Sequence, residues 1–272
     1  MKYLIITCLV SLSLQAQGFI NWQKPIVNAE HAMHQNHGGH TGKKLKQFQV
    51  HNDNPSALSE VYYIVSTSEK RKLVLENGLV SLPKTGFDNY HALVINQKHN
   101  NSVNSAVRYI YKHGRPSKTS PTKITHMKKS ELEIVPSPLP REHDRYAGSR
   151  TYAFELHFNG EVFPNTTVVL STSNGTEETL KSDENGEFKV TIPNDFKDVK
   201  TGRRKNKKAE LILKASHLDK GINYTTTLSM PYSVNPVDYW QSQTTGLIVL
   251  IIGLILGLFL FRNINKKKKR KA

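Results

Sequence analysis

The chain of 272 residues has almost no cysteine, because Cys8 is the only one. Cys8 lies within an N-terminal stretch that has the layout of a signal peptide, so the mature chain would contain no thiol. This excludes a disulfide framework, a thiolate metal site and a cysteine nucleophile. The chain also lacks the GxSxG, HExxH, P-loop and dinucleotide-binding motifs, and no spacing suggests a catalytic triad. We therefore expect a protein that is not an enzyme.

Acidic residues are few as well, 22 against 38 Lys and Arg, which gives a formal net charge of +16. Eight of the basic residues lie at the two ends, as Lys2, Arg262 and the run 266–271. The middle of the chain keeps 30 basic against 22 acidic residues and is only moderately basic. We expect no nucleic-acid partner, because the excess charge belongs to targeting segments rather than to a binding face.

The two ends carry apolar runs. Residues 1–17 combine Lys2, an apolar core at 3–14 and a small polar exit, which is typical of a secretory signal. An uncleaved anchor is the alternative, but the run is short for a membrane span. Residues 246–261 contain no polar side chain and would span about 24 Å as a helix, near the lower limit for crossing a membrane.

The flanks of the second run predict its orientation. Tyr239 and Trp240 precede it, where interfacial aromatic residues are common, and the basic tail 262–272 follows it. The positive-inside rule places that tail in the cytoplasm and residues from about 18 to 243 outside, as the signal does. Gly253 and Gly257 form a GxxxG pair that would allow a homodimer.

An exported chain without disulfides fits a bacterial periplasm, so we predict a single-pass protein of the bacterial inner membrane. Four N-x-S/T sequons, at Asn100, Asn165, Asn174 and Asn223, keep a eukaryotic cell surface open.

The region between the ends shows the short alternating runs of β-strands. A first β unit is predicted at 47–115, with strands at 61–65, 72–75, 79–82, 91–95 and 106–111, a hairpin turn at Asn77-Gly78 and a polar loop at 97–104. A connector rich in Pro, Ser, Thr and Lys follows at 116–130.

A second β-sandwich is predicted at 131–234, before a stalk at 235–245. Its strands are expected at 151–158, 166–172, 179–182, 188–192, 210–216 and 224–232, with turns at Asn159-Gly160, Asn174-Gly175 and 183–186. The fold class is therefore all-β, with one or two Ig-like or prealbumin-like sandwich units, a signal peptide and one C-terminal transmembrane helix.

Residues 18–46 have little apolar periodicity and are predicted to form a flexible arm. The arm contains His31, His34, His37 and His40, one at every third residue. Neutral imidazole is a good ligand for nickel, cobalt, copper and zinc, and four imidazoles on a Gly-containing arm could wrap one such ion. Met33, His51 and His143 are weaker candidate ligands. A polar linker with clustered histidines is the alternative.

An ordered set of motifs lies in the second unit: LEIVP at 132–136, the Gly148 region, a strand ending in FNG at 158–160, Val168, and SDENGEF at 182–188. This pattern resembles a bacterial periplasmic family described as a component of cobalt/nickel-type transport systems. The resemblance implies a sandwich domain, a C-terminal membrane anchor and a metal-linked accessory role. The chain departs from that pattern in having no histidine directly after the predicted cleavage site.

Two functional hypotheses follow. The first is a membrane-anchored periplasmic protein that captures a transition-metal ion through the histidine arm and passes it to an envelope transport partner. The second is a non-catalytic Ig-like protein that binds another envelope protein through a sheet edge or loop, with incidental histidines.

Overall fold

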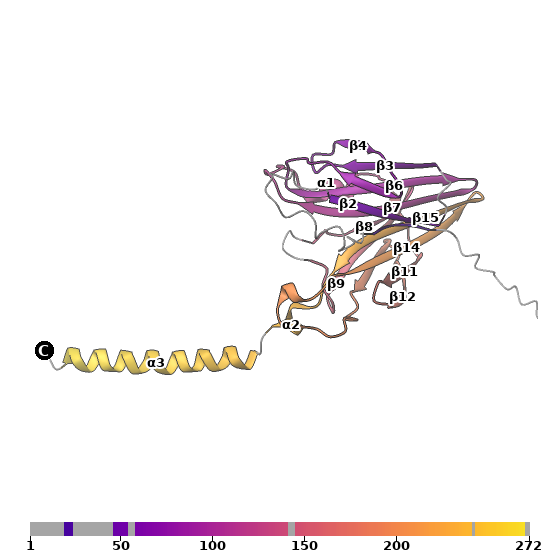
Figure 1. The fold of residues 1–272 in the computed structure, drawn as a ribbon. Coiled ribbons are helices and arrows are strands. Elements are labelled where there is room, and N and C mark those ends of the chain that lie inside the picture. The colour runs from indigo at the N-terminus through magenta and orange to yellow at the C-terminus, as the bar shows by residue number, and fades with distance from the viewer. Residues whose placement is uncertain (1–18, 24–45, 54–57, 141–144, 241–242, 270–272) are drawn as a thin grey trace, which may run out of the picture.

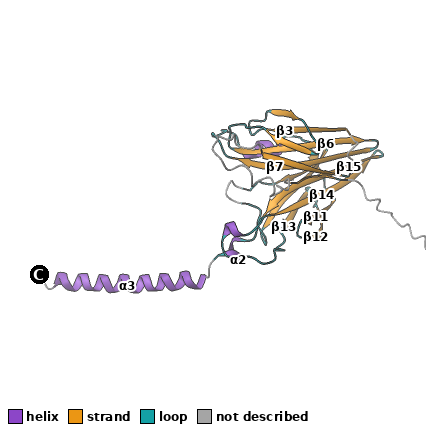
Figure 2. Cartoon of the chain, in the orientation of Figure 1, coloured by secondary structure: helices purple, strands orange, loops and turns teal. Residues whose placement is uncertain are grey.

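The computed structural model describes residues 19–23, 46–53, 58–140, 145–240 and 243–269. They form a β-sheet body followed by one long helix (Figures 1 and 2). The predicted all-β fold with sandwich units and a C-terminal apolar helix is confirmed.

A sheet of eight strands forms the middle of the body. Its strand order is β12-β11-β14-β15-β7-β6-β3-β4. All neighbours are antiparallel except β15 and β7, which run parallel. The strands are β3 (Leu58–Ile64), β4 (Lys70–Leu73), β6 (Asn89–His99), β7 (Ser102–Lys112), β11 (Thr167–Thr172), β12 (Glu177–Lys181), β14 (Ala209–Asp219) and β15 (Ile222–Tyr232).

A smaller sheet packs on each face of this large sheet. One contains β1 (Ile20–Gln23), β2 (Lys46–Asn52) and β5 (Leu79–Leu82), and the other contains β8 (Leu132–Pro136), β9 (Thr151–Phe158), β10 (Glu161–Val162) and β13 (Glu187–Thr191). Successive residues of β6 enter the two cores in turn: Ala92 and Val94 join the core with β8, β9 and β13, and Leu93 and Ile95 join the core with β1, β2 and β5. Burial on both faces explains the continuous apolar run of β6.

Several predicted features are corrected by the structure. The predicted polar loop at 97–104 belongs instead to β6 and β7, which turn at Asn100-Asn101. Backbone pairing satisfies this segment despite its polar side chains, and the buried Gln97 donates to the Ser59 Oγ at 3.3 Å. The predicted hairpin turn at Asn77-Gly78 exists, with positive φ at both residues and reciprocal backbone hydrogen bonds between Glu76 and Leu79, but it closes a single bridge, and the strands before and after it belong to different sheets.

The strand β1 lies at the start of the range predicted to be a flexible arm. Ile20 and Trp22 are 1% and 0% exposed, and the Trp22 Nε1 donates to the Ala106 carbonyl at 3.0 Å. The Thr227 hydroxyl donates to the Ile20 carbonyl at 2.6 Å. Residues 20–22 are therefore buried in the body and are not part of an arm.

The large sheet contains strands from both sides of the predicted connector. Residues 102–107 of β7 pair with residues 223–228 of β15, which joins the two predicted units through one ladder. Within the connector, the short helix α1 (Pro121–His126) begins after Ser120, whose hydroxyl accepts from the Thr122 amide at 3.2 Å.

Two helices end the described chain, the short α2 (Pro236–Tyr239) and the long α3 (Gln243–Lys269). Within α3, the segment Thr244–Asn263 has 20 residues, a mean hydropathy of 2.7 and no burial against the body. Twenty residues of helix span about 30 Å, the thickness of a bilayer core. The helix fits a single-pass anchor and includes the predicted span 246–261.

A candidate binding cleft between two separating strands

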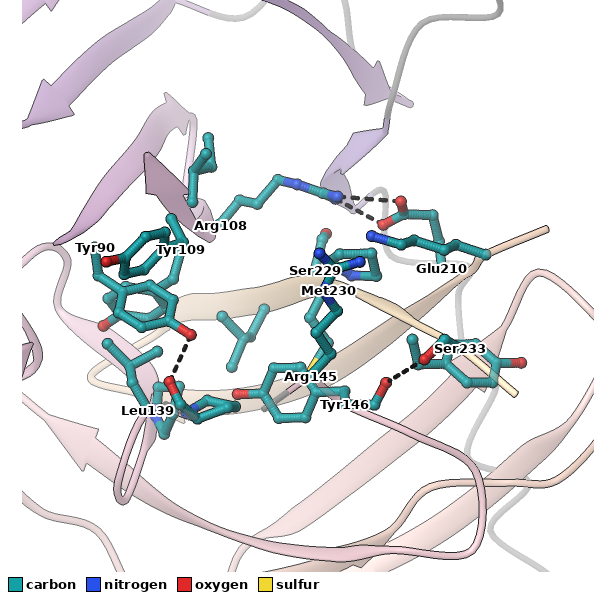
Figure 3. Close-up of a pocket in the computed structure, with 18 of the residues that line it drawn as sticks. Tyr90, Arg108, Tyr109, Leu139, Arg145, Tyr146, Glu210, Ser229, Met230 and Ser233 are labelled. Atoms are coloured by element: carbon teal, nitrogen blue, oxygen red, sulfur yellow. Dashed lines mark hydrogen bonds and ion pairs between the residues drawn. The ribbon is translucent and has the colours of Figure 1, made fainter. Parts of the chain in front are cut away.

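A cavity in the described structure begins where β7 and β15 separate. Their parallel ladder ends at the pair Val107–Leu228. Beyond it, β7 continues along β6 as far as Lys112, and β15 continues along β14 as far as Tyr232. A cavity of about 690 Å³ opens between the two diverging strands (Figure 3). The edges of the two strands therefore form its frame, together with the segments around 136–140, 145–146 and 207–208.

Pro231 gives a physical reason for the end of the ladder. The backbone of Glu210, opposite Pro231, exchanges its hydrogen bonds with Ser173 on the β11 side of β14. Glu210 and Pro231 are thus a non-hydrogen-bonded pair, so the Pro231 nitrogen faces β7. Proline has no N–H, and the ladder to β7 cannot continue through this position.

After β15, the chain pairs with a different segment. The Ser233 amide donates to the Tyr146 carbonyl at 3.0 Å, and the Gly148 amide donates to the Ser233 carbonyl at 2.9 Å. The cavity lies between the end of the β7–β15 ladder and the pairing of Ser233. Ser229 and Met230 form part of its wall (Figure 3).

Aromatic side chains form much of the wall, namely Phe48, Tyr90, Tyr109, Tyr111, Tyr146 and Tyr232. The Tyr90 hydroxyl donates to the Pro140 carbonyl at 2.6 Å, which fixes one wall (Figure 3). Burial raises the pKa of Tyr109 and of Tyr146 well above the usual value, and nearby groups (Glu133 for Tyr109) act in the same direction. Both phenols therefore stay protonated, and the Tyr109 hydroxyl is buried with no hydrogen-bond partner among the described residues.

Cationic side chains surround the cavity. Arg108, 4% exposed, is held by a two-pronged ion pair with Glu210 at 2.7 and 3.1 Å, and it also donates to the Trp22 carbonyl at 3.4 Å. Glu210 is the only carboxylate among the lining residues, and this pair uses its charge. Lys207 is exposed at the rim and has no ion pair with the described residues. Among the lining residues that the structure describes, basic side chains therefore outnumber acidic ones.

His51 is the one predicted metal ligand among the residues that the structure describes, and it does not line the cleft. His31, His34, His37, His40 and Met33 lie in 24–45, and His143 lies in 141–144, outside the described residues. His51 is on β2, about half exposed, with its Nε2 at 3.1 Å from the Asp53 Oδ1. Over the described ranges, no group of three or more His, Cys, Asp or Glu side chains could hold a metal ion. Metal binding therefore stays a prediction.

Sequence reasoning missed the cleft. Its residues come from β2, β6, β7, β14, β15 and the segments around 136–146, which no local pattern connects. Pro231 within an otherwise strand-like run was the one available sign, because a proline in a strand marks an edge.

Comparison with known proteins identifies no relative in sequence. No family model matches the chain, and no curated protein matches it. The resemblance to metal-transport components stays a prediction.

Similar solved structures include a Ca²⁺-stabilised adhesin with which an Antarctic bacterium binds ice, at 14% identity and a TM-score of 0.26, covering 80% of this chain. The chain spans about half (49%) of that structure. The D0-D1 domain of intimin is 14% identical with a TM-score of 0.27, and the match covers 79% of this chain and 98% of that one. The central fibronectin-III array of RIM-binding protein is 12% identical with a TM-score of 0.19, covering 73% and 67%.

Proposed function

We propose that this chain is a membrane-tethered, non-catalytic binding protein of the bacterial cell envelope, which takes an extended acidic segment of a partner protein into the cleft between β7 and β15. The observation that carries the proposal is the end of the β7–β15 ladder at Val107–Leu228, where the cavity of about 690 Å³ opens.

The frame of the cleft suits an extended chain. The ladder between β7 and β15 ends at Val107–Leu228, and beyond it the two strands diverge, each paired with its other neighbour. Extended peptides bind such edges through main-chain hydrogen bonds, and adjacent pockets select their side chains. The volume lies within the usual range of ligand pockets, about 300–1,000 Å³. Phe48 and five tyrosines supply aromatic walls.

The charge around the cleft favours an acidic ligand. Arg108 is neutralised by Glu210, but Lys207 at the rim is exposed and available for a carboxylate. Charge-assisted hydrogen bonds from ammonium groups to carboxylates are among the stronger polar contacts in proteins. The protonated tyrosines and the paired carboxylate support binding rather than acid–base catalysis at this site.

The proposed location rests on the ends of the chain. The signal-like residues 1–17, the apolar segment Thr244–Asn263 and the basic tail support a body in the periplasm, a helix through the inner membrane and a cytoplasmic tail. Metal capture by His31, His34, His37 and His40 is a second candidate function, favoured by the close spacing of these residues, with nickel, cobalt, copper or zinc as the ion.

A peptide-binding assay tests the cleft. The purified full-length chain in lipid nanodiscs is applied to an array of random octapeptides, each made in a Glu-containing and a matched Gln-containing form. We expect preference for the Glu forms, about tenfold weaker binding by Lys207→Glu, and unchanged binding by Lys181→Glu, an exposed residue on β12. Equal binding of both peptide forms, or equal effects of the two substitutions, contradicts the proposal.

A further inference from the structure

A second positively charged surface lies on the segment between β13 and β14. Residues 197–208, here named the basic loop, contain seven Lys or Arg residues and one acidic residue, Asp198. The loop includes a short 3-10 helix at Arg203–Lys205. Arg203, Arg204 and Lys205 are exposed, and no described residue forms an ion pair with them. Their positive charges are therefore available to solvent or to a partner outside the chain.

The loop has a fixed form rather than an extended one. The Asn206 side chain accepts from the Lys200 amide at 2.8 Å and donates to the carbonyls of Lys200 and Gly202 at 2.6 and 3.1 Å. Gly202 has a φ of 102°, a conformation that favours glycine. The Asn206 side chain thus hydrogen-bonds the backbone of the loop, and the basic side chains are not needed to stabilise the loop conformation.

The fold brings the basic loop to the membrane end of the body. In sequence, Lys208 precedes Thr244, the start of the apolar segment, by 36 positions. In the structure, the Gly202 amide donates to the carbonyl of Tyr239, the last residue of α2, at 3.0 Å. Thr244 follows Tyr239 by five positions, and five residues of chain can reach at most about 18 Å. The loop therefore lies within that reach of the point where α3 would enter a bilayer.

The neighbours of the loop suit a lipid interface. Trp240 is 59% exposed and Val237 is 55% exposed, immediately before the apolar helix, and Val199 of the loop is also exposed. Tryptophan is enriched at the level of lipid headgroups, and clusters of Lys and Arg next to a span attract anionic lipid. Exposed apolar and basic side chains thus lie on the two segments that the Gly202–Tyr239 hydrogen bond joins.

We propose that the basic loop binds anionic phospholipid headgroups in the membrane that α3 crosses, so that the body is held against the bilayer by two attachments instead of one. This inference rests on the proposed membrane tether. Two attachments restrict the tilt of the body, and the loop reaches the cleft through Lys207, which is a lining residue. Headgroup binding would therefore fix the orientation of the cleft above the membrane.

Fluorescence quenching in nanodiscs tests the inference. The full-length chain, with Cys8→Ser and Thr201→Cys, is labelled at position 201 with an environment-sensitive dye, and some headgroups carry a nitroxide quencher. We expect quenching to be about threefold stronger in discs with phosphatidylglycerol than in phosphatidylcholine discs, and to fall as salt is raised. Arg203→Glu with Arg204→Glu should abolish the difference.

Lys181→Glu with Lys220→Glu is the matched control, because it makes the same charge change where residues are exposed, away from the loop. This control should keep the lipid dependence. Equal quenching in both lipids, or equal loss in both double variants, overturns the inference while the chain remains in the disc. If the chain does not elute with the disc, the tether itself is wrong and the inference fails with it.

Discussion

Asp195 connects the end of β15 to the turn between β11 and β12. Its carboxylate accepts hydrogen bonds from Tyr232 (2.5 Å), Thr172 and Thr176 (2.7 Å each) and Asn174 (3.0 Å). Burial alone would raise the pKa of Asp195, but the four donors outweigh it and lower the pKa from 3.8 to about 2. The charged form is therefore favoured in the folded state.

The lowered pKa predicts a pH-dependent contribution to stability. A pKa about 1.8 lower in the folded than in the unfolded state corresponds to about 2.4 kcal/mol, and partial solvent exposure reduces this to about 1–2 kcal/mol. Because the folded pKa is the lower one, the stabilisation is complete above pH 4 and is lost as the pH falls from about 4 to about 2. About half of it should remain at pH 3.

The substitution Asp195→Asn tests this reasoning. We expect the free energy of unfolding to fall by about 1–2 kcal/mol at pH 7 and by about half as much at pH 3. Urea titrations of the full-length chain in detergent, monitored by the fluorescence of Trp22, provide the measurement. Glu178→Gln removes one exposed negative charge on β12 and should change stability by less than about 0.5 kcal/mol. An effect of Asp195→Asn that does not depend on pH would refute the argument.

Three further predictions concern the core, a turn and the histidines. Trp22→Ala should lower the free energy of unfolding by about 3–5 kcal/mol and Trp22→Phe by about 1–3 kcal/mol, measured in urea titrations followed by circular dichroism. The loss is smaller for Trp22→Phe because this change removes chiefly the hydrogen bond to Ala106, and equal losses would contradict this. Gly186→Ala places a Cβ at 2.8 Å from the Val162 side chain at a φ of +69° and should cost about 1–3 kcal/mol, more than Gly175→Ala, where the space is open. Replacing the four histidines between 31 and 40 by alanine should abolish calorimetric binding of nickel, copper, zinc or cobalt, and unchanged binding would exclude the proposed ligands.

The strands were predictable because their signals are local. Phe154 and Leu156 alternate with more exposed residues along β9, and the predicted range 151–158 matches the observed strand. The Asn159-Gly160 turn has positive φ at both residues, as Asn-Gly turns require. The apolar segment of α3 is detectable from length and composition alone.

The cleft was not predictable, because it depends on long-range pairing. Residues 102–107 pair with residues 223–228, more than 110 positions away, and the pairing is parallel. Periodicity shows that both runs are strands, but it does not show which strands are neighbours. The same holds for the basic loop, because the sequence does not show that Gly202 is hydrogen-bonded to Tyr239, just before the apolar helix.

Amino-acid composition predicts the wrong secondary structure for two segments. Residues 97–104 are polar and were expected to form a loop, but their backbone groups pair in β6 and β7. Residues 20–23 lie beside the polar stretch 24–45 and were included in the predicted arm, although Trp22 fills the core between two sheets. A four-residue strand is too short to give a periodic signal.

In-cell photo-crosslinking tests the central claim, that the cleft between β7 and β15 holds a partner segment. The photoreactive residue p-benzoylphenylalanine is placed at Tyr111, which lines the cleft, or at Thr179, which is exposed on β12. We predict one discrete adduct from position 111, identified by mass spectrometry and weakened by Lys207→Glu, and no such adduct from position 179. The absence of an adduct at 111, or the same adduct from both positions, would contradict the claim.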